Sequence, residues 1–214
     1  MKPFIVIPAF NEEKTIENVV KSVIKFVPNV IVADDGSFDN TAKFAEKAGA
    51  EVIRSSRNLG YDGILELGFH HATNKGATIL ISMDADGQHP PEGINEMISL
   101  VNNKDYDIVL GIRKKLPRFS ERTFAFLTNL KYSIKDITCG MKCYKASLYK
   151  QFKFKQDFNS IGTFLTLISL KKNYKVGKID INTKEREDIS RYGININSEI
   201  KIFYSIIRSI TFLI

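Results

Sequence analysis

The stretch TILISMDADGQHPP, residues 78–91, decides how the rest of the chain is interpreted. Residues 78–83 form an almost continuous apolar run, which predicts a strand buried on both faces. Two carboxylates, Asp84 and Asp86, follow that strand directly, and Gln88 adds a neutral oxygen two residues later. Because Mg²⁺ and Mn²⁺ prefer such oxygen ligands, the stretch predicts a divalent metal site at the end of a strand. An Asp-x-Asp pair is also common in surface turns, so its place after a buried strand carries the argument.

Outward from this stretch, apolar strand patterns alternate with helical patterns. Strands are predicted at residues 4–8, 29–33, 51–54, 78–83 and 107–112. Helices are predicted at residues 12–26, 38–48 and 60–74, and from Pro90 to residue 102. This alternation favours an α/β fold with an open, mainly parallel sheet and helices on both faces. Ligands of such sheets bind outside the carboxyl ends of the strands, which is where the Asp-rich segments lie.

The pattern is weaker in the second part of the chain. Helices are predicted at residues 119–131 and 158–171, a strand at 174–183 and a polar loop at 184–193. We expect one domain of residues 1–193, followed by an amphipathic helix of residues 194–214. That helix has apolar residues at helical spacing: Ile200, Phe203, Ile206, Ile207, Ile210 and Leu213. It could lie on a membrane or pack on the core, and the pattern favours neither.

Charge is unevenly distributed along the chain. Residues 1–100 carry a net charge of −5, residues 101–160 of +8 and residues 161–214 of +4. An acidic first half suits a metal, and a basic second half suits an anion or an anionic membrane surface. Binding of nucleic acid by the basic half would leave Asp84 and Asp86 unexplained. The 15 Phe and 8 Tyr residues make a disordered chain a poor interpretation.

Cysteine content and the N-terminus both favour a cytoplasmic protein. Cys139 and Cys143 are too few for a four-ligand zinc site, and we interpret them as reduced thiols. The chain runs from Met1 straight into its first strand pattern, without the features of a signal peptide.

Two further polar segments follow predicted strands. Pro8-Ala9-Phe10-Asn11-Glu12-Glu13 closes the first strand, and Asp34-Asp35-Gly36-Ser37 closes the second. A carboxylate in the second segment could accept hydrogen bonds from a base or a ribose, and Gly36 permits a close backbone approach. Asn and Asp at these positions could equally cap the following helices. We expect the two segments to form walls of a nucleotide pocket.

In this order, the three segments resemble those of glycosyltransferase family 2. The family shows Pro-Ala-(Tyr/Phe)-Asn-Glu, then Asp-Asp-Gly-Ser, then Asp-Ala-Asp with Gln-His-Pro-Pro, which match Pro8–Glu12, Asp34–Ser37 and Asp84–Pro91. Arg57-Asn58-Leu59-Gly60 is similar to its Arg-Asn-x-Gly turn. The resemblance covers residues 3–150 and extends to synthases of polyprenyl-phosphate sugars, such as those of the dolichyl-phosphate mannose type. It implies a GT-A fold, a nucleoside-diphosphate sugar donor and Mg²⁺ or Mn²⁺.

The resemblance also implies roles for individual residues. The residues expected to contact the nucleoside are Pro8, Phe10, Glu12, Asp35 and Gly36. Asp84, Asp86 and Gln88 would hold the metal and the diphosphate, with Asp86 also catalytic. Arg113, Arg118 and Arg122 would bind the phosphate of a polyprenyl acceptor at the cytoplasmic face of a membrane. His89 is expected to be a turn residue before Pro90.

Two segments depart from the family pattern. Thr138–Lys142 is similar to the family's (Ser/Thr)-Gly-Phe-Arg segment, but Lys142 replaces the arginine that could clamp a phosphate with two hydrogen bonds. Arg186–Gly193 is one residue shorter than the family's Arg-Glu-x-Gly-x-Ser-(Arg/Lys)-Tyr loop and lacks its glycine. An alternative acceptor is the hydroxyl group of a polysaccharide or another sugar. An alternative function is that of a nucleotide-binding protein without catalytic activity.

Overall fold

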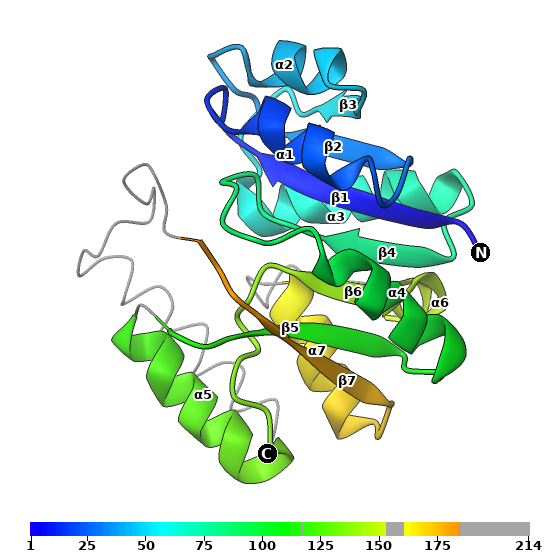
Figure 1. The fold of residues 1–214 in the computed structure, drawn as a ribbon, viewed down its shortest axis with the longest axis vertical. Helices are drawn as coiled ribbons and strands as arrows, with labels where there is room; N and C mark the ends of the chain where they lie inside the picture. The colour runs from blue at the N-terminus through cyan, green and yellow to red at the C-terminus, as the bar shows by residue number, and fades with distance from the viewer. Residues whose placement is uncertain (117, 153–160, 185–214) are drawn as a thin grey trace.

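The computed structural model in Figure 1 describes residues 1–116, 118–152 and 161–184. Its strands are β1 (Pro3–Ala9), β2 (Val30–Asp34), β3 (Glu51–Arg54), β4 (Ile79–Ser82), β5 (Ile108–Arg113), β6 (Lys142–Lys145) and β7 (Val176–Ile181). Its helices are α1 (Ile16–Val23), α2 (Thr41–Lys47), α3 (Gly60–Asn74), α4 (Gly93–Asn103), α5 (Phe119–Tyr132), α6 (Ala146–Gln151) and α7 (Ile161–Lys171). None of the helices in these ranges is both long and apolar enough to cross a bilayer.

The strands form one mixed sheet in the order β3-β2-β1-β4-β6-β5-β7. Neighbouring strands are parallel except at β6, which runs antiparallel to both β4 and β5. The expected α/β architecture with a mainly parallel sheet is therefore confirmed. The sequence pattern did not reveal β6 and α6, because β6 has lysines at both ends and only two apolar residues between them.

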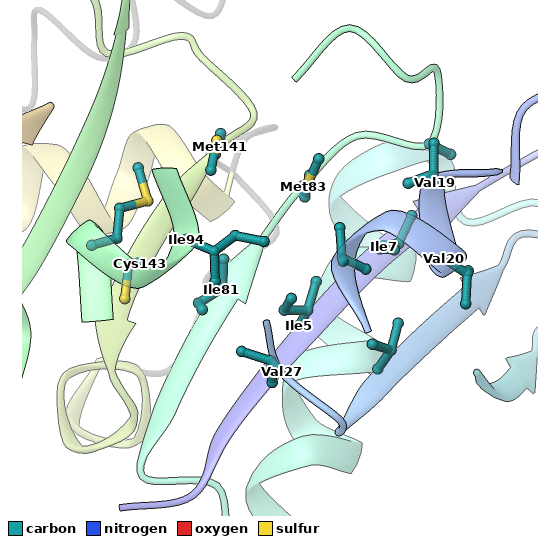
Figure 2. Close-up of a cluster of buried hydrophobic side chains, with 14 of the residues drawn as sticks. Ile5, Ile7, Val19, Val20, Val27, Ile81, Met83, Ile94, Met141 and Cys143 are labelled. Atoms are coloured by element: carbon teal, nitrogen blue, oxygen red, sulfur yellow. The ribbon is translucent and has the colours of Figure 1, made fainter. Parts of the chain in front are cut away.

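Helices cover both faces of the sheet, as the alternating pattern predicts. Alternate residues of β1 point to opposite sides of the sheet. Ile5 and Ile7 belong to the core that includes residues of α1 and α4, while Phe4 and Val6 belong to the core that includes residues of α3 and α7. Figure 2 shows the first of these cores, in which Ile7 of the sheet lies toward Val20 of α1 and Ile81 lies beside Ile94 of α4. Burial on both faces explains why the strand segments are continuously apolar.

Helix α3 lies unusually close to the sheet. A Cβ atom added to Gly68 would lie 2.3 Å from Cγ1 of Val6, so only glycine fits at this contact. Gly68, one of the two glycines that weaken the helical pattern of residues 60–74, therefore has a packing reason. The close approach sets the middle of α3 directly against β1 and β2.

Most predicted elements are confirmed to within a few residues. Helix α1 begins at Ile16 rather than residue 12, because Glu12 accepts backbone hydrogen bonds from Thr15 and Ile16 in a turn. The predicted helix 158–171 is α7, described from Ile161. The loop bearing Arg186 and Arg191 and the amphipathic helix of residues 194–214 lie outside the described residues, and both stay predictions.

Candidate functional site

The three polar segments meet at one edge of the sheet. Strands β1, β2 and β4 are parallel and end there, with Ala9 opposite Asp34 and Val6 opposite Ser82. Because β6 is antiparallel, it begins at the same edge, and its first residue, Lys142, lies opposite Ser82. The loops that follow β1, β2 and β4 and the loop that precedes β6 therefore share one rim, as expected for a doubly wound sheet.

The two adjacent aspartates after β2 have different partners. Asp34 is fully buried, accepts hydrogen bonds from the backbone and hydroxyl groups of Ser37, and lies 3.2 Å from Nε of Arg54. Asp35 accepts hydrogen bonds from the backbone N–H groups of Leu59 (2.6 Å) and Gly60 (2.9 Å). Burial raises the pKa of Asp35 against the lowering effect of these two donors. Asp34 thus shapes its own loop, whereas Asp35 fixes the start of α3.

The loop after β1 is joined to the loop after β2 by hydrogen bonds. The backbone N–H of Asn11 donates to the Ser37 hydroxyl at 2.8 Å, and the Asn11 side chain accepts from the Phe38 backbone at 2.8 Å. The backbone N–H of Glu12 donates to the Thr41 hydroxyl at 2.7 Å. Phe10 and Phe38 meet edge to face, with ring centroids 6.1 Å apart. These contacts bring Phe10, Glu12 and the Asp35 loop together as the sequence predicts.

Pro8 and Gly36 have backbone roles. Pro8 lies inside β1, where it is buried and paired with Ala33. Gly36 has a φ of 76°, a conformation that favours glycine, and a Cβ atom there would lie 3.5 Å from the Ser55 carbonyl oxygen. Gly36 therefore permits the turn that places Asp35 beside Leu59 and Gly60.

Asp84 is held on three sides. The Tyr61 hydroxyl donates a hydrogen bond to its Oδ1 at 2.8 Å, and Nδ1 of His89 lies 3.6 Å from its Oδ2. On the third side, a Cβ atom added to Gly140 would lie 2.3 Å from both carboxylate oxygens. Burial alone would lower the pKa of His89, but Asp84, Cys139 and Asp86 together outweigh it and raise the pKa to about 9. A phenol, an imidazole and a bare backbone thus surround the carboxylate.

The first turn of α3 connects two of the predicted site segments. Gly60 bonds to Asp35, and the next residue, Tyr61, bonds to Asp84. The carboxylates that follow β2 and β4 therefore lie on either side of one short backbone segment. The sequence predicts that acidic side chains from separate loops lie at one rim, and the first turn of α3 links the loops that carry Asp35 and Asp84.

Asp86 and Gln88 lie in the turn after Asp84. The backbone N–H of Gln88 donates to Asp86 Oδ1 at 3.0 Å. The Gln88 side-chain nitrogen donates to the Lys184 carbonyl at 3.1 Å, and the Lys184 backbone N–H donates to the Gln88 carbonyl at 2.9 Å. These contacts tie the turn to the chain that follows β7, so that the second half of the sheet also borders the acidic site.

The basic residues after β5 are arranged differently from what the sequence predicts. The Arg113 guanidinium donates two hydrogen bonds to Asp136, at 2.7 and 3.1 Å, and one to the Thr138 hydroxyl at 2.8 Å. Although burial opposes it, Arg113 holds the pKa of Asp136 below its usual value. Arg113 thus fixes the loop that leads to Gly140, and its charge is largely compensated there.

The other two arginines lie in and before the first turn of α5. Nη1 of Arg118 lies 3.5 Å from the buried carboxylate of Glu121, which is also 3.5 Å from Arg113. Arg122 is exposed, and its Nε donates to the Leu116 carbonyl at 2.9 Å. Of the three arginines, Arg122 therefore has the most exposed cation.

Lys142 is buried beneath the site. Its Nζ donates to the Cys139 carbonyl at 2.6 Å, and burial lowers its pKa. The position where the family resemblance implies an arginine thus holds a buried amine that bonds to the backbone. Nearby, Asp62 accepts a hydrogen bond from the backbone N–H of Ile161 at 2.8 Å, at the start of α7.

Asp62 should give the folding stability a distinctive pH dependence. Burial raises its pKa to about 7, so the folded protein keeps this proton while the unfolded chain loses it near pH 4. The free energy of unfolding should therefore fall as pH rises from about 4 to about 7, and then level off. Asp62→Asn should flatten this slope in urea titrations across that pH range. Asp180→Asn, at an exposed position of β7, should keep it; an unchanged slope in Asp62→Asn would refute the assignment.

Comparison with known proteins identifies the family. The family model described as "Glycosyl transferase family 2" matches residues 4–158. The chain belongs to this family. It is a glycosyltransferase, and its sheet and helices are those of the GT-A fold.

Similar proteins include enzymes that act on lipid phosphates. The UDP-N-acetylglucosamine–dolichyl-phosphate N-acetylglucosaminyltransferase of Methanococcus voltae is 29% identical, over 95% of this chain and 94% of its own. The dodecaprenyl-phosphate galacturonate synthase of Rhizobium johnstonii is 26% identical, over 89% of this chain and 62% of its own. Among solved structures, glucosyl-3-phosphoglycerate synthase from Mycobacterium tuberculosis, in complex with Mn²⁺, UDP and glucosyl-3-phosphoglycerate, has a TM-score of 0.79 at 16% identity. That match covers 99% of this chain and 79% of the other, and it shows the fold.

Sequence reasoning gave no role beside Asp84 to three residues: Tyr61, His89 and Gly140. Each contacts Asp84 from a distant part of the chain or, for His89, from beyond the turn. His89 lies in a bend before Pro90 as expected, but the burial of its imidazole against Asp84 was not predicted. No local signal pointed to Tyr61.

Replacing Tyr61 by Phe should lower transfer without unfolding the protein. The change removes only the hydroxyl that bonds to Asp84, and a hydrogen bond to a charged group contributes about 1.5–3 kcal/mol. We expect kcat/KM to fall by roughly 10-fold or more. Tyr174→Phe removes a hydroxyl bonded to Gln151, far from Asp84, and should leave kcat/KM unchanged. Equal activity of Tyr61→Phe and wild type would show that Asp84 needs no such donor.

Proposed function

We propose that this glycosyltransferase moves a sugar from a nucleoside-diphosphate sugar to a polyprenyl phosphate, with inversion at the anomeric carbon and with Mg²⁺ or Mn²⁺. The observation that supports it best is the meeting of an acidic and a basic segment at one rim. Asp84 lies against Gly140, and two residues earlier in the same loop the Thr138 hydroxyl accepts a hydrogen bond from Arg113. A site for a metal-bound diphosphate thus adjoins the basic region before and within α5. The names of the similar proteins from Methanococcus and Rhizobium point to the same class of acceptor.

The residues present suit a divalent cation of the hard, oxygen-binding kind. Asp86 and Gln88 supply oxygen ligands on a turn fixed by its own backbone hydrogen bond, and Asp84 stands beside them. Within the described ranges, no group of three or more acidic, His or Cys side chains surrounds a common point. Mg²⁺ sites commonly use one or two carboxylates and complete their shell with substrate phosphates and water. When bound, such an ion would stabilise the charge on the leaving diphosphate.

The protein's own contribution is mainly positioning. Phe10, Glu12 and Asp35 would hold the nucleoside between the loops after β1 and β2. Arg122, with Arg118, would attract the acceptor phosphate, which is largely anionic at neutral pH and needs little help from a base. Its oxygen would attack the anomeric carbon from the face opposite the diphosphate, as the bond to that leaving group breaks. We assign Arg113 to the support of this arrangement, because Asp136 already binds its guanidinium.

A donor and acceptor panel tests this proposal. The purified protein is given UDP- and GDP-sugars with Mn²⁺ or Mg²⁺, and either polyprenyl phosphate or a soluble sugar acceptor. We expect radiolabel to move from donor to the organic phase, and only with a divalent metal present. NMR of the product should show the anomeric configuration opposite to that of the donor. Label recovered only in water-soluble glycan would instead support the sugar-hydroxyl acceptor, and a retained configuration would refute inversion.

We also propose that the reaction takes place at the cytoplasmic face of a membrane. Polyprenyl phosphates are lipids, and Cys139 and Cys143 are both buried and free, as suits a reducing compartment. The protein should be found with membranes after cell fractionation and should be released from them by salt or mild detergent.

A further inference from the structure

Helix α5 has an inverted distribution of polarity. An ordinary surface helix buries its apolar side chains and exposes its polar ones. In α5 the buried residues are Ser120, Glu121, Phe124 and Thr128. The exposed ones include Phe119 (77% exposed), Phe126 (67%), Leu127 (37%) and Leu130 (77%). We define the apolar face of α5 by Phe119, Phe126, Leu127 and Leu130. Exposure of these four side chains to water is unfavourable.

The apolar face of α5 is also turned away from the sheet. In Figure 1, α5 projects from the body of the molecule and does not lie over either face of the sheet. Nothing in residues 1–116, 118–152 or 161–184 covers these four side chains, as their exposure shows. Three of the four follow helical spacing, since Phe119, Phe126 and Leu130 are separated by seven and four residues. They therefore form one stripe rather than scattered surface residues.

Basic residues surround this stripe. Residues 114–135 contain six Lys and Arg residues and a single acidic one, Glu121, whose side chain is buried. Lys114, Lys115, Arg122, Lys131 and Lys135 are all exposed. A helix with exposed aromatic and aliphatic side chains among cations is typical of one that lies in the interface of an anionic membrane. A second protein copy would place like charges against each other, so charge complementarity favours lipid headgroups.

The position of α5 relative to the site suits this partner. Arg113 ends β5 at the rim of the sheet, and α5 begins six residues later. Glu121 on the first turn of α5 pairs with both Arg113 and Arg118. A bilayer that held Phe119 and Phe126 would therefore bring its headgroups to the arginines beside the acidic site.

We propose that the apolar face of α5 docks this protein on an anionic lipid surface, with Phe126 and Leu130 buried among the acyl chains and the surrounding lysines on the headgroups. The purpose of this docking rests on the proposed function, because docking would present the phosphate of a membrane-embedded acceptor to the arginines. Such docking assigns the membrane contact to described residues of the catalytic domain, independently of residues 194–214.

Vesicle binding by the full-length protein tests the proposal. Wild type should cosediment with vesicles of phosphatidylcholine mixed with phosphatidylglycerol, less with phosphatidylcholine alone, and less at high salt. The double variant Phe126→Ala/Leu130→Ala keeps every charge and should bind the mixed vesicles about 10-fold or more weakly. Leu67→Ala, at an exposed apolar position of α3, is the matched control and should bind like wild type. Neither variant touches a residue placed in the site.

Several outcomes would overturn the docking proposal. These are absence of binding by wild type, equal binding by the double variant, and loss of a wild-type dimer in that variant, which would make the face a contact between copies. If residues 194–214 covered the apolar face of α5 instead, the double variant would lose thermal stability but would still bind vesicles. A second assay measures sugar transfer to a water-soluble, short-chain isoprenyl phosphate. It distinguishes a failure of the docking proposal from a failure of the proposed function. The docking variant should keep that activity and lose transfer to vesicle-bound acceptor, whereas failure of the proposed function would remove both in wild type.

Discussion

Asp86→Asn should abolish most transfer while the protein stays folded. The change keeps the shape of the side chain and removes the negative charge proposed to bind the metal. Asp86 accepts a backbone hydrogen bond from Gln88, which the amide oxygen of Asn can also accept, so the turn should persist. Loss of one such electrostatic contact at a reacting centre costs on the order of 100- to 1000-fold in kcat. Initial rates over a range of Mn²⁺ concentrations measure the effect, together with a shift of the metal dependence to higher concentration.

Asp180→Asn is the matched control, since it makes the same chemical change at an exposed position of β7. It should retain wild-type kcat and metal dependence. Circular dichroism of both variants checks that neither is unfolded. Near-wild-type transfer by Asp86→Asn would remove the metal role proposed for this residue.

Gly140→Ala should damage the site through a single methyl group. The new Cβ atom would lie 2.3 Å from both Asp84 oxygens, far inside any tolerable contact, so the carboxylate must move. Overpacking of this kind typically costs about 1–3 kcal/mol in stability. The displaced Asp84 would also lose its geometry with Tyr61 and His89. We therefore expect a large fall in kcat together with a lower midpoint of thermal unfolding.

A double-mutant cycle separates this contact from any other effect of the methyl group. Asp84→Ala removes the atoms that the new Cβ would strike. In that background, adding Gly140→Ala should cost much less stability than it does in wild type, which gives a coupling energy between the two positions. If the two stability losses simply add, the close approach of Asp84 to Gly140 does not explain the glycine.

The sequence predicts the first half of the fold well because its signals are local. Strands β1, β2 and β4 are unbroken apolar runs, and each is followed directly by polar residues that must reach solvent or a ligand. A few consecutive residues are thus enough to predict both the burial of each strand on two faces and the position where it ends. The meeting of the segments around Asp35 and Asp84 then follows from the parallel arrangement.

The rest depends on contacts between distant residues. Strand β6 is short, bounded by lysines, and gains its place only by pairing with β4 and β5. Tyr61 reaches Asp84, and Asp136 binds Arg113, across spans of 23 residues, and no local pattern indicates that these pairs meet. The basic residues illustrate the same limit, since the sequence groups Arg113, Arg118 and Arg122 as phosphate ligands, whereas the structure pairs Arg113 with Asp136 and leaves Arg122 exposed.

The antiparallel strand β6 divides the sheet into two parts, which we propose have different functions. On one side, β1, β2, β3 and β4 support the loops proposed to hold the donor, and on the other, β5 and β7 support the region proposed to meet the acceptor. Where they meet at the rim, the Asp84 carboxylate lies against Gly140 and the Ser82 hydroxyl donates to the Gly140 carbonyl. Such a division lets one part diverge in evolution without disturbing the other. It also suggests exchanging residues 104–152 with those of a relative as a route to new acceptor preference with the original donor.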